Sequence, residues 1–385
     1  MRIAVAVSGG VDSLCALLLL RRAGHEVFAL HALLGQPAVC GAPGAPDGLE
    51  AACRTFDVPL EVVDLRAAFA REVITPFARA YAGGLTPNPC ARCNRSIKFG
   101  ALMDAALGLG AEALATGHYA RLAPRSAQGA SGPFLAMAAH TAKDQSYFLS
   151  LVPRERLARA LFPLAGLTKT ACRALVAGAG LEVPLPGESH DICFAPGGVD
   201  AYREFLARQW QDLGITPPGA GPVLLCEGAE PAADNADGQP CAMSSPQAPP
   251  HAGHLRRIGT HAGLWRYTEG QRRGLGLAYA EALHVLRKDI GTNALIVGPR
   301  SCLGMRGCIA GEVNVLVAPG AWPGHPLVRC RYGGAAVPAR VRAEGEKLRI
   351  DFEEGCFTSA PGQVVTLYDE DGVVLAGGVV EEIFA

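Results

Sequence analysis

Glycines and polar side chains follow the first apolar run of the chain. The alternating run 3–7 has the pattern of a strand, and the leucine-rich stretch 14–20 has that of a helix. Between them lies Ser8-Gly9-Gly10-Val11-Asp12-Ser13. Two glycines let the backbone bend sharply and approach a ligand, and the N–H groups at a helix start favour an anion. The stretch therefore predicts a phosphate site, with both serine hydroxyls as additional donors.

Asp12 would repel a bare phosphate, so we expect it to hold a Mg²⁺ ion that bridges the phosphates of a nucleotide. No Gly-Lys-Ser or Gly-Lys-Thr follows the turn, which argues against a Walker-type kinase or GTPase. The turn resembles the PP-loop of the N-type ATP pyrophosphatases, which cleave ATP to AMP and pyrophosphate. The bland alternative is a glycine-rich turn without a ligand, as in any α/β fold.

A second chemically distinctive stretch is Thr86-Pro87-Asn88-Pro89-Cys90-Ala91-Arg92-Cys93-Asn94-Arg95-Ser96-Ile97-Lys98-Phe99. Its two prolines fix an extended approach, and its two cysteines open a helix. The helix N-terminus and the three cations should lower a thiol pKa toward the reactive range. The Cys-x-x-Cys spacing alone allows a redox dithiol, half of a metal site or two buried thiols.

A third stretch, Glu188-Ser189-His190-Asp191-Ile192-Cys193-Phe194, places a cysteine in a turn with polar flanks. Such a position suits an exposed nucleophile. The alternative is an inert, packed thiol.

The composition of the whole chain limits its class. Its 385 residues suggest two or three domains, and 35 basic against 36 acidic residues restrict any nucleic-acid site to a local patch. No apolar run could span a bilayer, and the N-terminus enters a strand directly. We therefore expect a cytoplasmic protein without a membrane partner. Thiols stay reduced there, so most of the thirteen cysteines should pack as small hydrophobes.

The elements that must position these residues alternate along the first half of the chain. Strands are expected at 26–33, 60–63 and 112–116, and helices at 49–57, 65–82 and 91–107. This alternation predicts a doubly wound parallel sheet, whose ligands bind beyond the carboxyl ends of the strands. The turns 8–13, 32–36 and 116–119 fall at that edge, and the Gly- and Pro-rich loop 35–48 should lie beside the nucleotide.

The second half predicts different architecture. Helices are expected at 153–161, 169–179 and 199–212. Residues 226–255 lack periodicity and read as a surface insertion or linker. From 283 onward, eight short β-prone runs alternate with turns, which predicts a small antiparallel barrel. The expected domains are thus a catalytic domain (1–205), a small central domain (206–282) and a barrel (283–385).

Six motifs occur in one order along the chain. They are the turn 8–13, Asn-Pro-x-x-x-Cys-Asn (88–94), Thr-Gly-His-Tyr (116–119), Lys-Asp-Gln-Ser-Tyr-Phe (143–148), Asp-Ile-Cys-Phe (191–194) and Gly-Gln-Arg-Arg-Gly-Leu-Gly (270–276). The ordered set resembles the tRNA-specific 2-thiouridylase family, from about residue 2 to residue 380 apart from the insertion. The resemblance implies an adenine nucleotide alpha hydrolase-like catalytic domain, followed by two tRNA-contacting domains.

The resemblance also implies an activity, the ATP-dependent 2-thiolation of the wobble uridine of tRNA. ATP would adenylate the C2 oxygen of uracil. Cys193 would carry the incoming sulfur as a persulfide, and Cys93 would be the resolving thiol, leaving a Cys93–Cys193 disulfide. The implied partners are tRNA and a sulfur-relay or persulfide donor protein, and we expect a monomer.

Site residues carry over by position. Those expected at ATP are Ala6, Val7, Ser8, Gly9, Gly10, Val11, Asp12, Ser13, Ala32 and Gly117. Those expected at the target base or the tRNA are Asn88, Pro89, Cys90, His118, Lys143, Asp144, Gln145, Arg331, Tyr332 and Gln363. Arg340 and Arg342 are expected to be ordinary solvated surface.

Two positions depart from the family pattern. Many relatives have Asp where this chain has Cys90, so Cys90, Cys93 and Cys193 could instead hold an iron–sulfur cluster that delivers hydrosulfide. The Met-Lys-Trp-like run after the second strand is replaced by Ala32-Leu33-Leu34. We therefore expect backbone contacts to adenine near Ala32.

Two further function classes stay open from the residues. A small-molecule PP-loop ligase would need an ammonia source, of which the chain has no signature, and would leave the paired cysteines idle. A thiol or iron–sulfur sensor that binds RNA would leave the PP-loop without a purpose.

Overall fold

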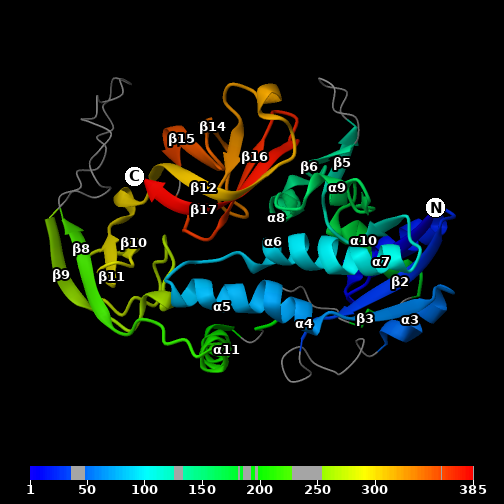
Figure 1. The fold of residues 1–385 in the computed structure, drawn as a ribbon, viewed down its shortest axis with the longest axis horizontal. Coiled ribbons are helices and arrows are strands. Elements are labelled where there is room, and N and C mark those ends of the chain that lie inside the picture. Colours follow the sequence, from blue (N-terminus) through cyan, green and yellow to red (C-terminus); the bar gives the residue numbers. More distant parts are fainter. Residues whose placement is uncertain are drawn as a thin grey trace.

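The structure is a computed structural model that describes residues 1–35, 48–124, 133–180, 183–184, 192–195, 198–227, 254–356 and 358–384. Figure 1 shows a parallel sheet near the N-terminus and, at the other end of the molecule, a second sheet. A barrel lies beside the long helices between them. No helix within the described ranges combines the length and apolarity needed to cross a membrane.

The first sheet is parallel throughout, with the strand order β3-β2-β1-β4-β7. Its strands are β1 (Arg2–Ala6), β2 (Glu26–Leu33), β3 (Leu60–Asp64), β4 (Ala113–Ala115) and β7 (Ala160–Leu161). This order confirms the expected doubly wound sheet. One detail differs, because the helix expected at 153–161 ends early as α9 (Arg154–Leu157) and the chain then adds β7.

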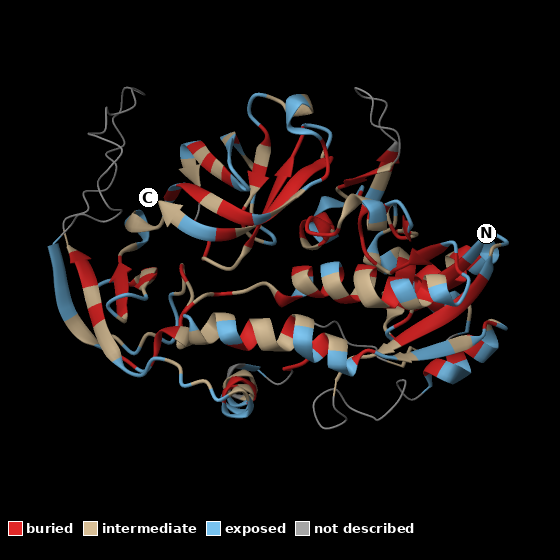
Figure 2. Ribbon diagram, viewed as in Figure 1, coloured by how far each residue is buried: buried red, intermediate tan, exposed pale blue. Residues whose placement is uncertain are grey.

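Helices cover both faces of this sheet. Alternate side chains of β1 separate two cores, since Ile3 and Val5 pack with α1 (Val11–Arg22) and α10 (Lys169–Gly178), whereas Ala4 packs on the opposite face. Most residues of β1, β2 and α1 are buried, and Figure 2 shows β2 largely red. The short helix α3 (Leu49–Thr55) lies against the first of these cores through Leu49.

Two long helical spans form the other layer. The first joins α4 (Arg66–Phe69), a π-helical segment η1 (Ala70–Ile74) and α5 (Thr75–Ala82). The second joins α6 (Pro89–Cys93), a π-helical segment η2 (Asn94–Leu102) and α7 (Met103–Gly108). They confirm the helices expected at 65–82 and 91–107. Wide π turns, which sequence periodicity does not reveal, occur often at functional sites.

The central domain is a four-stranded sheet of order β10-β11-β8-β9. Its strands are β8 (Gly221–Glu227), β9 (His254–His261), β10 (His284–Asp289) and β11 (Ala294–Gly298). The helix α11 (Gly198–Leu213) precedes it and packs on α5, where the Trp210 indole N–H donates to Ala78 O at 2.8 Å. Most of the insertion expected at 226–255 lies outside the described residues.

The C-terminal barrel is closed, with the order β12-β15-β14-β13-β16-β17. Its strands are β12 (Met305–Val315), β13 (Leu327–Arg329), β14 (Val337–Glu344), β15 (Lys347–Cys356), β16 (Val364–Tyr368) and β17 (Val374–Phe384). The domain boundary expected at residue 283 therefore does not coincide with the start of the barrel. The first two of the eight expected strands pair with the central sheet, and the barrel begins at Met305.

Short elements of the first domain anchor the barrel. These are β5 (Arg121–Pro124), β6 (Pro133–Ala136) and α8 (Ser146–Leu149). The Tyr147 hydroxyl on α8 donates to Val364 O at 2.7 Å, and the Thr366 hydroxyl donates to Ser150 Oγ at 3.0 Å. A Cβ at Gly377 would lie 2.7 Å from the backbone oxygen of Ser150, so the two domains meet almost backbone to backbone.

Candidate active site

The turn between β1 and α1 has the geometry of an anion site. Gly9 has a φ of +88°, a backbone conformation that side chains disfavour, and Gly10 precedes the helix in an extended conformation. The Ser13 hydroxyl accepts from Ser8 N at 3.2 Å and donates to Gly10 O at 2.9 Å. Ser13 therefore braces the turn. The first N–H groups of α1 have no acceptor within the helix and can bind a phosphate.

Gly117 packs directly against this turn. A Cβ at position 117 would lie 2.7 Å from the carbonyl carbon of Asp12 and 2.9 Å from Ser13 N. Only glycine fits such an approach without a shift of backbone. The end of β4 and the start of α1 thus meet at the carboxyl edge of the sheet, as the strand order predicts.

Asp12 is already paired at both carboxylate oxygens. The Tyr119 hydroxyl donates to Oδ1 at 2.8 Å, and Lys169 Nζ contacts Oδ2 at 2.6 Å. Lys169 thus offsets the negative charge that prompted the magnesium hypothesis. The described residues contain no group of three or more His, Cys, Asp or Glu side chains arranged to hold a metal ion. As placed, Asp12 does not fit a vacant magnesium ligand.

Sequence reasoning missed Lys169 and the role of Tyr119. Tyr119 lies in the Thr-Gly-His-Tyr motif, which offered a signal, whereas Lys169 opens α10 without any motif. Two buried thiols, Cys15 and Cys172, lie behind these residues. The hydrogen bond between them lowers the pKa of Cys172 to about 7 and raises the pKa of Cys15. Both cysteines are fully buried, as expected of small packing residues.

The end of β2 lies at the same carboxyl edge of the sheet as the turn after β1 and the end of β4. The buried His31 ring contacts Val7 O through Nδ1 at 2.7 Å, and burial lowers the pKa of His31. Because a carbonyl only accepts, Nδ1 carries the proton. Ala32 follows on β2, half-buried and opposite Val63. The loop expected beside the nucleotide, 35–48, lies mostly outside the described residues.

His118 links the nucleotide edge to the helical span from α6 to α7, which carries Cys90, Cys93 and Lys98 and is called the cysteine helix below. Lys98 Nζ lies 3.4 Å from His118 Nε2, and Thr116 Oγ1 lies 2.7 Å from His118 Nδ1. An ammonium only donates, so Nε2 accepts and Nδ1 donates its proton to Thr116. Burial, and then the charge of Lys98, lower the pKa of His118 well below its usual range. His118 is therefore a neutral, fixed imidazole.

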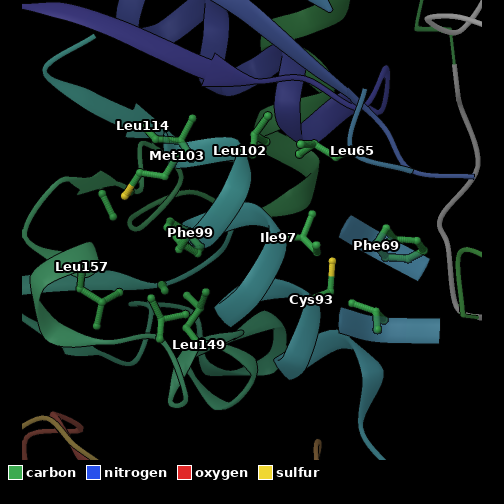
Figure 3. Close-up of a cluster of buried hydrophobic side chains, with 14 of the residues drawn as sticks. Leu65, Phe69, Cys93, Ile97, Phe99, Leu102, Met103, Leu114, Leu149 and Leu157 are labelled. Carbon is green, nitrogen blue, oxygen red and sulfur yellow. The ribbon is translucent and has the colours of Figure 1, made fainter. Parts of the chain in front are cut away.

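Asn88 starts the helix that carries Cys90 and Cys93. Its Oδ1 accepts from Ala91 N at 3.1 Å, an N-cap, and Pro89 occupies the first turn, where proline is tolerated. Cys90 is exposed, whereas Cys93 is buried. Figure 3 shows Cys93 and Ile97 on one side of a helix that faces Phe69.

The expectation that this setting lowers the thiol pKa values is wrong for the structure described. Burial raises the pKa of Cys93 to about 11. The side chain of Cys90 keeps exposed surface, but the protein around its sulfur desolvates the thiolate and raises the pKa of Cys90 as well, and Lys98 only partly opposes both rises. Arg92 and Arg95 form ion pairs with Glu312 of the barrel at 3.7 and 3.3 Å, so they serve the domain contact. Of the three expected cations, Lys98 is the one that affects the thiols.

Cys193 lies on a turn that docks on the core containing Cys93. Cys193 itself is exposed, but the next residue, Phe194, is buried, with ring centroids 5.7 Å from Phe69 and 5.1 Å from Phe77. Phe194, Phe69 and Cys93 belong to one hydrophobic cluster. The fold thus brings the stretches around both expected thiols to one cluster. Residues 185–191, which precede this turn, lie outside the described residues.

The residues expected to contact RNA fall into two groups. Lys143 and Tyr332 are exposed, and the Tyr332 ring lies 4.4 Å from that of Phe148, beside half-buried Arg331. The others brace the fold. Asp144 is buried and pairs with Arg329 at 3.2 Å, and Gln145 Oε1 accepts from Tyr119 N at 3.0 Å.

Gln363 also braces the fold, since its Nε2 donates to Thr86 O at 2.9 Å. Arg340 and Arg342 are exposed, consistent with ordinary surface.

Comparison with known proteins covers the whole chain. Family models match at residues 1–197 (tRNA methyl transferase HUP domain), 251–299 (tRNA methyl transferase PRC-barrel domain) and 305–380 (aminomethyltransferase beta-barrel domain). The tRNA-specific 2-thiouridylase MnmA of Oleidesulfovibrio alaskensis is 46% identical over 389 residues, covering 100% of both chains. The protein of the same name from Lawsonia intracellularis is 41% identical over 387 residues and covers 99% of each.

Distant similarity also extends to solved structures. The U34-tRNA thiolase NcsA from Methanococcus maripaludis, with its 4Fe–4S cluster, is 14% identical with a TM-score of 0.33. It covers 55% of this chain and 67% of its own. That score is too low to carry the cluster over to this chain.

Proposed function

Since the chain belongs to the tRNA-specific 2-thiouridylase family, we propose that it uses ATP to replace the C2 oxygen of a tRNA wobble uridine by sulfur. The observation that carries the proposal is the contact between Lys98 and His118. Through it the nucleotide turn, the end of β4 and the cysteine helix form one continuous site.

ATP binds at the turn Ser8–Ser13 in this proposal. Its phosphates contact the N–H groups at the start of α1 and approach Gly117, whose missing Cβ keeps the path open. The nucleotide also contacts the backbone of Ala6, Val7, Val11 and Ala32. A magnesium ion would screen the phosphates. To bind Asp12 it would have to displace Lys169.

The first chemical step solves a leaving-group problem. Oxide leaves C2 of uracil poorly, whereas AMP leaves well. The C2 oxygen attacks the α-phosphorus of ATP as N3 of the base gives its proton to water, and pyrophosphate departs with the electron pair of the broken P–O bond. Lys98 lies beside the neutral His118 and offsets the negative charge on the phosphates as pyrophosphate leaves. The uridine reaches the site extruded from its stack, against Asn88, Pro89 and Cys90.

The second step transfers sulfur. The terminal sulfur of a persulfide on Cys193 attacks C2 and expels AMP, which leaves the base joined to Cys193 through a disulfide. The Cys93 thiolate then attacks Sγ of Cys193. That attack breaks the bond to the transferred sulfur and forms a Cys93–Cys193 disulfide, which an external thiol reduces. The released base takes up a proton at N3 and becomes 2-thiouridine. The docking of Phe194 on the cluster of Cys93 supports this pairing.

Other partners follow from this chemistry. The persulfide requires a donor protein that itself carries a persulfide, because the outer sulfur must arrive already at the sulfane level. The tRNA contacts Lys143, Arg331 and Tyr332, which lie at the surface around α8, whereas we assign Asp144, Gln145 and Gln363 supporting roles. A cytoplasmic monomer suits a tRNA substrate and a site built within one chain.

One assay tests the proposal. The protein is incubated with ATP, a persulfide donor and tRNA transcripts that carry wobble uridine, and 2-thiouridine is measured by nucleoside mass spectrometry. We expect product and tRNA-dependent AMP release, and Cys193→Ser should abolish product while ATP and tRNA still bind. AMP release that needs ammonia but no tRNA would instead indicate a small-molecule ligase, and no hydrolysis a sensor.

A separate measurement addresses the cluster alternative. Iron and acid-labile sulfide are determined after anaerobic purification. Active, iron-free protein would support the persulfide route. Stoichiometric iron that is lost in Cys90→Ser, Cys93→Ser and Cys193→Ser alike would support the cluster.

A further inference from the structure

Thr86 lies at the head of the segment that carries Asn88, Cys90 and Cys93, and it is buried. All three of its polar atoms are bound by other domains. Its N–H donates to Pro361 O of the barrel at 2.8 Å, and its O accepts from Gln363 Nε2 of the barrel at 2.9 Å. Its hydroxyl oxygen accepts from Lys288 Nζ of the central sheet at 2.9 Å.

The ammonium of Lys288 is buried and held in place beside Thr86. Its side chain is 2% exposed, and its ammonium also reaches Tyr267 O at 3.2 Å and Glu269 at 3.4 Å. The ammonium thus has two hydrogen-bond acceptors, Thr86 Oγ1 and Tyr267 O, and one opposite charge, the Glu269 carboxylate. A buried ammonium is costly unless it is paired in this way. The lysine therefore fixes Thr86 to the central sheet with a defined direction.

The barrel holds the same point through its backbone. Gly362 has a φ of +95°, and a Cβ there would lie 3.0 Å from both C and O of Thr86 and 3.1 Å from Pro87 N. The barrel loop 361–363 thus packs closely on the peptide that joins Thr86 to Pro87. Neither neighbour can move far without moving this peptide.

The segment that follows Thr86 is stiff, so the position of Thr86 determines where that segment lies. Pro87 and Pro89 stiffen the two steps that follow, and the Asn88 cap locks the start of α6. No glycine interrupts residues 86–93. The junction also adjoins the Gly270–Gly276 motif, because Glu269 directly precedes it and Gly270 N donates to Val285 O of β10 at 2.8 Å.

We propose that Thr86 is a positioning residue through which the central sheet and the barrel together set the placement of segment 86–93 at the reacting base. Its hydroxyl contact with Lys288 and its backbone contacts with residues 361–363 are the two arms of this junction. The part of the inference that concerns turnover rests on the proposed function.

The test compares Thr86→Val, which keeps the side-chain shape but loses the hydroxyl, with Thr86→Ser, which keeps the hydroxyl. Thr260→Val, at an exposed hydroxyl of β9, is the matched control. Thr86→Val should lower kcat for 2-thiouridine formation about 10- to 100-fold, as expected for a misplaced reacting group. The KM for tRNA should change less than about twofold, because the surface that binds RNA is untouched. Thr86→Ser and Thr260→Val should match the wild type.

A second measurement does not depend on activity. The alkylation rate of Cys93, followed by peptide mass spectrometry in native protein, should rise in Thr86→Val and not in Thr86→Ser. If Thr86→Val does not fold, Gln363→Met removes the side-chain hydrogen bond of the other arm and should also give a rise.

Different results would contradict the proposed function and the proposed junction at Thr86. Wild-type protein that makes no 2-thiouridine would contradict the proposed function, while the labelling comparison would still test the junction. Labelling and kcat at wild-type values in Thr86→Val would overturn the junction. So would a raised KM for tRNA with an unchanged kcat.

Discussion

At the scale of single residues, Lys98 is the charge that connects the site. It lies 3.4 Å from His118, and among the causes that shift the pKa values of Cys90 and Cys93 it is the cation that opposes burial. Only one of the three cations near Cys93 in the sequence therefore acts on the thiols. The other two are drawn to Glu312, more than 200 positions later, a pairing that local sequence cannot predict.

Lys98→Met should make Cys93 less reactive. The pKa of Cys93 is about 11, and loss of a cation that favours the thiolate raises it further. Since only the thiolate is alkylated, the wild-type rate should climb from about pH 7 to about pH 10, and the variant should be slower at each pH. Iodoacetamide labelling read by mass spectrometry measures both. Lys347→Met, at a barrel lysine paired with Glu381, is the control; equal rates in all three would contradict the role of Lys98.

Gly117→Ala should weaken ATP binding about tenfold or more. The new Cβ would lie 2.7 Å from the backbone of Asp12, and relief of such overpacking typically costs about 1–3 kcal/mol. Calorimetric titration with ATP measures the effect. Gly108→Ala, whose Cβ would meet nothing within 4 Å, should bind ATP like the wild type. Unchanged affinity in Gly117→Ala would argue against ATP at this turn.

At the scale of elements, the turn 192–195 is held by one aromatic side chain. Phe194 contacts Phe69, Phe77 and Phe205. Phe194→Ala should lower the free energy of unfolding by about 3–5 kcal/mol, the usual cost of deleting a buried ring. It should also release the turn that carries Cys193. Denaturant unfolding measures the first effect, with exposed Tyr279→Ala as the control. Stability at the wild-type value would contradict the docking of this turn.

The sequence predicts elements better than their partners. The strand, turn and helix at 2–22 and the helices at 65–82 and 91–107 follow from local patterns and are confirmed. The membership of β10 and β11 does not follow, because β11 pairs in parallel with β8, as in Leu295 opposite Val223. A short β-prone run shows that it is a strand but not which sheet receives it. The pairing of Lys169 with Asp12 eluded prediction for the same reason.

At the scale of the whole molecule, a formal net charge of −1 gives tRNA no general attraction, so binding must rely on local cations. We expect the logarithm of tRNA affinity to fall linearly with the logarithm of salt concentration. Lys143→Gln should reduce that slope by about one phosphate contact. Arg342→Gln, at a side chain already paired with Asp351, should leave the slope unchanged in filter-binding titrations. A slope insensitive to Lys143 would place the RNA elsewhere.

The central sheet offers a practical consequence. β8 ends and β9 begins at cross-strand partners, Glu227 opposite His254, so the chain leaves and re-enters the fold at adjacent points. Ring closure between adjacent points becomes only slightly less favourable as the connection lengthens. A fluorescent protein or an affinity handle spliced between these two residues should therefore leave the catalytic end of the molecule undisturbed.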